Sequence, residues 1–236
     1  MDVQASCSIG DRLRMVLDRI RLAEQRSGRP QGSVRLVAAT KAISPDRIRE
    51  AIVAGLTIAG ENRLQEAIPK IEALRDESIA WHFIGHLQRR KVRSVVGVFD
   101  LIHSVDSFEL AQEIDRRAEA ASLKQDVLLE VNIGMEKTKA GFLPDDLERT
   151  LSQFETFSHV AIKGLMVIPP VVDHAEQARP YFRAVRELAR RLASQAIPQI
   201  AMDELSMGMS RDYHVAIEEG ATFVRVGTAI FGERYV

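Results

Sequence analysis

Short apolar runs alternate with longer amphipathic runs from residue 35 onward, and this alternation constrains the fold more than any other feature of the sequence. Runs typical of buried strands lie at 35–40, 57–61, 80–85, 99–105, 126–133, 161–168, 203–208 and 223–228. Helical patterns lie between them, near 45–54, 62–75, 87–96, 107–122, 145–155, 174–195 and 211–219. Strands that alternate with helices in this way predict a parallel sheet.

Eight strand–helix units of this total length predict an α/β fold, a (β/α)8 TIM-like barrel. An open doubly wound sheet is the alternative, but its first turn usually carries GxGxxG, and this chain has "TKAISP" at 40–45. A further amphipathic helix is expected at 9–27, so we interpret residues 1–30 as an N-terminal helical extension. No linker or low-complexity tract divides residues 1–236, which predicts a single domain.

The charge and the cysteine count exclude several classes of protein. The chain has 32 basic and 33 acidic residues and a net charge of −1, which gives no electrostatic reason to bind nucleic acid or an anionic membrane. Its single cysteine, Cys7, excludes an intramolecular disulfide and fits a reducing compartment. We see no signal peptide and no run near the ~20 apolar residues that span a bilayer. We therefore expect a cytoplasmic protein.

Polar and small residues gather where the predicted strands end, although the strand bodies are aliphatic. In a barrel of this kind, the carboxyl ends of the strands meet at one mouth, where ligands bind. The residues predicted to lie there are Lys41, Glu61, Asn62, His82, Gly85, His86, His103, Ser104, Asn132, Met166, Pro169, the segment 206–210, Gly227 and Thr228.

Lys41 directly follows the first strand-like run, "RLVAAT". A lysine amine in a pocket of low dielectric has a depressed pKa and attacks aldehydes to form a Schiff base. Alternatively, Lys41 extends its ammonium into solvent from the end of the strand.

Two further segments have the residues of a phosphate site. "LSMGMS" at 205–210 precedes a predicted helix, and "VRVGTAIFG" at 224–232 places Gly227 and Thr228 after the last strand. Free N–H groups and hydroxyls at such positions suit a phosphate, although Ser210 also fits an ordinary helix cap. Arg225 faces the barrel interior by alternation, and a core salt bridge is the alternative reason for it. A phosphorylated aldehyde is the ligand that uses Lys41, both loops and Arg225.

At these residues the sequence resembles the pyridoxal phosphate homeostasis proteins, which are related to the N-terminal barrel domain of alanine racemase. The resemblance runs from about Val34 to Arg234. It rests on "LVAATK", "AGENRLQE", "WHFIGHLQRRK", "VNIGMEKTKAGF", "KGLMVIPP" and "LSMGMSRDYHVAIEEGATFVRVGTAIFGER", which occur in the order found in the family.

The resemblance implies a role for nine residues in binding pyridoxal 5′-phosphate, and it implies no metal. Lys41 would form a Schiff base with the aldehyde, Ser210, Gly227 and Thr228 would hold the phosphate beside Met209, and Arg225 would face the pyridine nitrogen. Asn62 and His82 would line the pocket, and Met166 would pack near the ring. The chain departs from the family where Ala42, Ile43 and Ser44 follow Lys41 and where His86 replaces a frequent proline.

Arginine only donates hydrogen bonds, so Arg225 at the pyridine nitrogen would leave the ring a weak electron sink. Racemases of this type also need a tyrosine from a further domain, and none of Tyr181, Tyr213 and Tyr235 is an obvious substitute. The resemblance therefore favours a cofactor carrier or buffer without robust catalysis. A weakly active, racemase-like enzyme and an aldolase-like barrel are the alternatives.

Three expectations concern partners. Apo forms of pyridoxal phosphate enzymes are candidate recipients of the cofactor. Lys137 and Lys139, in the loop after the fifth strand, could receive the cofactor as it leaves Lys41, or could belong to a solvated loop. We expect a monomer, because the dimerising domain of the racemases is not found in this sequence.

Overall fold

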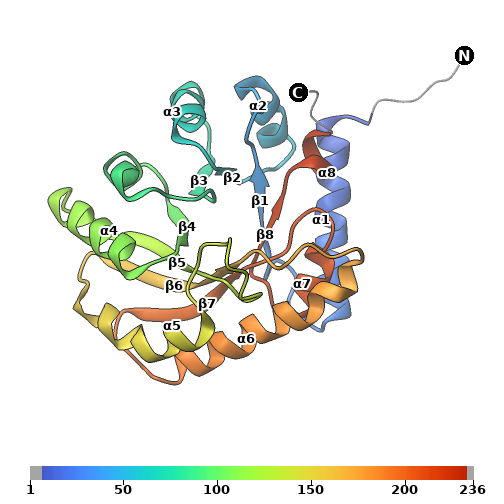
Figure 1. The fold of residues 1–236 in the computed structure, drawn as a ribbon. Coiled ribbons are helices and arrows are strands. Elements are labelled where there is room, and N and C mark those ends of the chain that lie inside the picture. The colour runs from blue at the N-terminus through green and yellow to red at the C-terminus, as the bar shows by residue number, and fades with distance from the viewer. Residues whose placement is uncertain (1–6, 233–236) are drawn as a thin grey trace, which may run out of the picture.

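Eight parallel strands close into one barrel in the computed structural model, which describes residues 7–232 (Figure 1). The strands are β1 (Arg35–Ala39), β2 (Ile58–Glu61), β3 (Ala80–Phe83), β4 (Leu101–Val105), β5 (Gln125–Val131), β6 (Val160–Val167), β7 (Ile200–Ser206) and β8 (Phe223–Val226). They pair in chain order, and β8 pairs with β1 to close the sheet, with Val37 opposite Arg225. The predicted barrel is confirmed, and each strand overlaps a predicted run.

Helices surround the barrel (Figure 1). The α-helices are α1 (Ile9–Arg26), α2 (Pro45–Val53), α3 (Leu64–Ala73), α4 (Phe108–Ala120), α5 (Pro144–Thr150), α6 (Arg179–Ala193), α7 (Tyr213–Glu218) and α8 (Thr228–Phe231). Three 3₁₀ turns add η1 (Arg89–Ser94), η2 (Leu151–Thr156) and η3 (Ala175–Ala178). No helix of residues 7–232 is both long and apolar enough to cross a bilayer.

The N-terminal helix α1 packs along α7 and α8, on the side of the barrel where β8 meets β1 (Figure 1). Ser8 caps it: the Asp11 N–H donates to the Ser8 hydroxyl at 3.0 Å, and the Ser8 N–H donates back to the Asp11 carboxylate at 3.2 Å. The expected N-terminal helix is therefore present. Residues 1–6 of the predicted extension, and Arg234 and Tyr235, lie outside the described residues.

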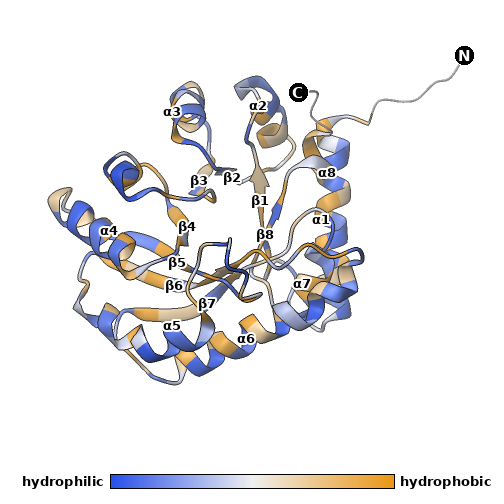
Figure 2. Cartoon of the chain, in the orientation of Figure 1, coloured by the Kyte–Doolittle hydropathy of each residue, from blue (hydrophilic) through white to orange (hydrophobic). Residues whose placement is uncertain are grey.

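Two apolar cores hold the barrel together. The larger lies between the strands and the helices, and Figure 2 shows helices with both orange and blue residues around the strands, as expected for amphipathic helices. The smaller fills the barrel interior with Val37, Ile58, Leu101, Leu128, Met166 and Phe223. Because this cluster closes the inside of the barrel, a ligand can enter only above it, at the carboxyl ends of the strands.

Three predicted helices were wrong in detail, and one helix was missed. Residues 87–96 form only the 3₁₀ turn η1, because Arg89 and Arg93 lie four residues apart with like charges and only Val92 of the turn is buried. The patterns at 145–155 and 174–195 each divide into a 3₁₀ turn and an α-helix. Pro180 marks the second division, since proline fits the first turn of an α-helix. The short helix α8 was not predicted.

Candidate functional site

The backbone around Lys41 is tied at the carboxyl end of β1. The Thr40 N–H donates to the carbonyl of Gly60 at 3.0 Å. Ala42 has a φ of 58°, a left-handed conformation that is uncommon without glycine, and its N–H donates to the Glu66 carboxylate at 2.9 Å. Hydrogen bonds on both sides of Lys41 therefore fix its backbone, while its side chain lines a cavity at the mouth of the barrel.

A buried ion pair lies directly behind this loop. The Lys70 ammonium donates to Glu61 Oε1 at 2.7 Å and to the carbonyl of Thr40 at 2.8 Å, and the Thr40 hydroxyl donates to the same carboxylate at 2.7 Å. Glu61 has no exposed surface, and Lys70 is 7% exposed. Sequence reasoning missed this pair. The available signal was the spacing of Lys70 from Leu64 and Ala67, which places the lysine on the apolar face of its helix.

The cavity has a volume of about 380 Å³, and it collects seven of the nine residues predicted to bind a ligand. These are Lys41, Asn62, Met209, Ser210, Arg225, Gly227 and Thr228. They come from the ends of β1, β2, β7 and β8, so distant parts of the sequence meet at one place. His82 and Met166, the other two, do not line the cavity: they are 5% and 1% exposed and lie in the barrel interior below it.

The loop of residues 207–212 is shaped for one side of the cavity. The Arg225 N–H donates to the carbonyl of Gly208 at 3.0 Å, and the Met209 N–H donates to Asp212 Oδ1 at 2.7 Å. Gly208 has a φ of 90°, and a Cβ there would lie 2.8 Å from Cα of Tyr213. Only glycine lets the loop pack this closely on α7.

Gly227 and Thr228 form the second loop of the cavity. Gly227 is the N-cap residue of α8, and the Ile230 N–H donates to its carbonyl at 2.9 Å. The N–H groups of Thr228 and Ala229 therefore precede the first hydrogen bond of the helix. Backbone donors and two hydroxyls, those of Ser210 and Thr228, line this end of the cavity.

Arg225 forms the floor between the two loops. Its guanidinium donates to the Ser206 carbonyl at 2.8 Å, to the Ser206 hydroxyl at 2.5 Å and to the Val167 carbonyl at 2.8 Å. Because a guanidinium has five N–H groups, donors remain for a ligand. Burial lowers the pKa of Arg225 to about 10, against the opposing effect of the Glu130 and Asp212 carboxylates, so it stays protonated near neutral pH.

A chain of polar side chains leads from Arg225 into the barrel. The Ser206 hydroxyl lies 2.8 Å from Nδ1 of His103, and Nε2 of His103 lies 2.9 Å from Nδ1 of His82. Burial lowers the pKa of His82 to about 4 and that of His103 well below its ordinary value. Both imidazoles are therefore neutral near pH 7. His82 does not contact the cavity itself and is connected to it by the hydrogen bonds through His103, Ser206 and Arg225.

Three titratable groups that were not predicted as ligand-binding residues, His86, Asp106 and Glu130, lie near the carboxyl ends of β3, β4 and β5. His86 lines the cavity, and its Nδ1 lies 3.3 Å from the Asp106 carboxylate. Burial raises the pKa of Glu130, and the charge of Asp106 adds to the rise. The sequence contained a signal for His86 alone, because this residue follows a predicted strand and replaces a proline that is frequent in the family.

The two lysines of the loop after β5 differ in environment. Lys137 is exposed, whereas Lys139 is half-buried, forms an ion pair with Glu136 and donates to the Pro169 carbonyl at 3.1 Å. Lys139 lines an apolar hollow of about 380 Å³ that shares Met209 and Ser210 with the cavity. Lys139 is therefore next to the predicted site, but it lies outside the cavity that contains Lys41.

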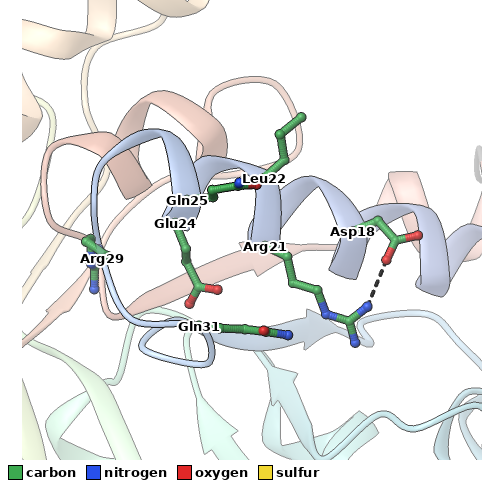
Figure 3. Close-up of a pocket in the computed structure, with 7 residues that line it drawn as sticks. All are labelled: Asp18, Arg21, Leu22, Glu24, Gln25, Arg29 and Gln31. Atoms are coloured by element: carbon green, nitrogen blue, oxygen red, sulfur yellow. Dashed lines mark hydrogen bonds and ion pairs between the residues drawn. The ribbon is translucent and has the colours of Figure 1, made fainter.

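A larger hollow of about 560 Å³ lies under α1 and the turn that follows it (Figure 3). Its buried carboxylate, Glu24, accepts hydrogen bonds from the Gly32 N–H at 3.1 Å and the Val34 N–H at 2.8 Å. Arg21 is bonded to Asp18 across the same hollow (Figure 3). These groups hold the turn in place, so this hollow has no set of converging free groups comparable with the cavity at the mouth.

The protein is an eight-stranded parallel barrel, with a lysine after the first strand and polar loops after the last two strands. This combination is typical of the class of the alanine racemase N-terminal domain. The family model of that domain matches residues 13–235. An alanine racemase from Clostridium difficile 630 has the same fold, with a TM-score of 0.70 at 15% identity, over 96% of this chain and 58% of that one.

Closer relatives specify the family. A pyridoxal phosphate homeostasis protein of Aquifex aeolicus is 47% identical over 95% of this chain and 97% of its own length. The structure of PipY from Synechococcus elongatus with PLP bound is 42% identical, with a TM-score of 0.79, over 91% of this chain and 99% of PipY. The chain belongs to the pyridoxal phosphate homeostasis protein family.

Proposed function

We propose that this protein binds pyridoxal 5′-phosphate covalently through Lys41 and acts as a carrier or buffer of that cofactor. The observation that carries the proposal is one cavity containing an amine, two loops rich in hydrogen-bond donors, and an arginine between them. The likeness to PipY, whose structure has PLP bound, supports the same ligand.

The residues present fit this cofactor. Oδ1 of Asn62 is buried and has no hydrogen-bond partner among residues 7–232, so it is available to a ligand. In the proposal, Ser210, Gly227 and Thr228 hold the phosphate beside Met209, and Arg225 donates toward the ring nitrogen. His82 and Met166 support the floor from below, through the polar chain and the interior apolar cluster.

A carrier role is supported because the arginine at the ring nitrogen cannot donate a proton there and no tyrosine of the described residues lines the cavity as a base. Bound pyridoxal phosphate supplies an aldehyde that condenses with amines and a ring that withdraws electrons. Arg225 has only donors and stays protonated, so it cannot give the ring nitrogen a proton as a carboxylic acid would. No tyrosine of residues 7–232 lines the cavity, and Tyr213 lies on the far side of the 207–212 loop.

One observation favours a second candidate, a weak pyridoxal phosphate-dependent enzyme. His86 lines the cavity and is paired with Asp106, so it can accept and return a proton there. The test is exchange of the α-hydrogen of alanine and other amino acids in deuterated water, followed by NMR. Exchange that depends on His86 would favour the enzyme, and its absence in the wild-type protein would favour the carrier.

The first experiment is a visible absorption spectrum before and after borohydride reduction, with peptide mapping of the reduced protein. We expect a yellow protein that loses its colour on reduction, with the pyridoxyl mass on the peptide that contains Lys41. A colourless protein that takes up no added pyridoxal phosphate would contradict the proposal. Lys41→Ala is the matched variant, and it should carry no reduced adduct.

We further propose that the cofactor passes to apo-enzymes and that Lys137 and Lys139 assist its departure. Lys139 supports this role because its hollow adjoins the cavity. Replacing both lysines with alanine should slow reactivation of an apo-enzyme while leaving cofactor binding unchanged. Unchanged transfer would exclude the role. The monomeric state and the cytoplasmic location stay predictions, to be tested by light scattering and cell fractionation.

A further inference from the structure

A small hollow of about 290 Å³ lies on the outer side of the 207–212 loop, between α1 and the start of α7. Arg19 and Arg26 line it from α1, seven residues apart and hence on one face of that helix. Arg211 and His214 line it from the other side. Ser210 lines both this hollow and the cavity that contains Lys41, so the two spaces lie on either side of one residue.

The hollow has an excess of positive charge. Arg19, Arg26 and Arg211 are exposed, and none forms an ion pair with another of residues 7–232. The one carboxylate in its lining, Glu218, accepts a hydrogen bond from Arg179 at 2.6 Å, and Arg179 also pairs with Glu176 and Glu219. Three arginines that form no ion pair within the described chain, and one carboxylate, therefore line this hollow, which leaves an excess of positive charge.

A buried tyrosine gives a second, independent indication of a ligand. Tyr213 lines the hollow and is 3% exposed, but its hydroxyl has no hydrogen-bond partner among residues 7–232. An unpaired buried hydroxyl costs about 1–3 kcal/mol, so such groups usually have a partner. Burial raises the pKa of Tyr213, and the Arg19 guanidinium opposes that rise, first by a side-chain interaction with the hydroxyl oxygen and second by its charge. The phenol is therefore a neutral donor beside a cation.

We propose that this hollow is a second anion site, which binds inorganic phosphate or a phosphate monoester. Guanidinium groups match phosphate oxygens with paired hydrogen bonds, and the Tyr213 hydroxyl would donate a further one. A volume near 300 Å³ is at the lower end for ligand pockets, which suits a small anion.

The shared Ser210 couples this outer site to the cavity. Coupling between two sites is reciprocal. Phosphate in the outer site therefore changes the affinity of the inner site for the cofactor, and the cofactor changes the affinity of the outer site for phosphate by the same factor. This coupling rests on the proposed binding of pyridoxal phosphate. The binding of phosphate to the outer site does not, since Lys41 has no part in it.

The test is calorimetric titration of inorganic phosphate into the Thr228→Val variant, in a buffer free of other polyvalent anions. Thr228 lines the inner cavity alone, so this variant weakens phosphate binding in the inner cavity and leaves the lining of the outer hollow unchanged. We expect one phosphate to bind, and Arg19→Gln with Arg26→Gln to weaken that binding at least tenfold. Arg14→Gln with Arg93→Gln changes the net charge equally outside the hollow and should leave binding within twofold.

Tyr213→Phe gives an outcome that a general charge effect would not. Removing the hydroxyl should weaken phosphate binding about fivefold, yet the variant without phosphate should be at least as stable as the parent, because the unpaired group is gone. No phosphate binding in Thr228→Val, or equal losses in the two double variants, would overturn the proposal. A failure of the function proposed above would instead appear as no uptake of pyridoxal phosphate, with outer phosphate binding intact.

Discussion

The buried pair of Glu61 and Lys70 predicts an unequal response to single and double substitution. Lys70→Met removes two charge-assisted hydrogen bonds, one to Glu61 Oε1 at 2.7 Å and one to the Thr40 carbonyl at 2.8 Å. Each such bond contributes about 1.5–3 kcal/mol. The Glu61 carboxylate would remain buried with only the Thr40 hydroxyl as a donor, because its Oε2 already has no partner.

We therefore expect Lys70→Met to lower the free energy of unfolding by about 3–5 kcal/mol, the usual effect of removing one partner of a buried pair. The double variant Glu61→Gln with Lys70→Met should recover most of this loss, to within about 1.5 kcal/mol of the wild type. A neutral amide accepts the Thr40 hydrogen bond and leaves no buried charge.

Urea unfolding followed by the fluorescence of Trp81, the single tryptophan, measures these differences. Lys163→Met is the control: it breaks a pair with Asp126 whose side chains are 41% and 42% exposed, and it should cost less than about 1 kcal/mol. A loss below about 1 kcal/mol for Lys70→Met, or a double variant no more stable than the single one, would refute the reasoning. In the double variant, which we expect to be nearly as stable as the wild type, the yield of borohydride-trapped cofactor on Lys41 measures whether the loop still positions this lysine.

Three further predictions concern the barrel core and the loops. First, because burial lowers the pKa of His82 to about 4, the unfolded chain gains its proton near pH 6.5 while the folded chain stays neutral, so stability falls as pH falls through this window. From pH 7 to pH 5 this contributes a loss of about 2 kcal/mol, which His82→Gln should abolish and His174→Asn should retain; parallel pH profiles would contradict it. Second, Gly208→Ala should cost more than Gly28→Ala by about 1 kcal/mol or more, because both residues have positive φ but a Cβ meets a neighbour within 4 Å only at Gly208. Equal losses in urea unfolding would exclude the packing argument. Third, Thr228→Val should weaken binding of pyridoxal phosphate about tenfold and leave binding of pyridoxal, which lacks the phosphate, unchanged; an equal effect on both ligands would place Thr228 away from the phosphate.

The sequence was sufficient for the order and type of the strands because each buried strand is a short aliphatic run between helical patterns. It was also sufficient to bring Lys41, Ser210 and Thr228 to one mouth, since the ends of parallel strands converge in a barrel. Helices were less predictable where like charges or proline interrupt them, as at Arg89 and Pro180.

Depth within the barrel could not be predicted. Lys41 follows its strand-like run, whereas His82 lies inside the run 80–85. In the structure β3 ends at Phe83, and the buried His82 lies in the interior one layer below the cavity. Likewise, the pairing of Glu61 with Lys70 depends on how α3 is rotated against β2, which periodicity gives only approximately. Alternation identifies the face that a side chain occupies, whereas its layer depends on strand tilt and register.

The chain of hydrogen-bonded side chains in the barrel interior should also give an NMR signal that reports on the cavity. With His82 and His103 neutral, the proton between them lies in a site closed to water, because His103 has no exposed surface. Such a proton exchanges slowly enough to give a resolved imidazole N–H resonance in proton NMR. Its chemical shift depends on the Ser206 hydroxyl and, through it, on Arg225. Occupancy of the cavity floor could then be read from a signal of the native protein, without a label and without following any reaction.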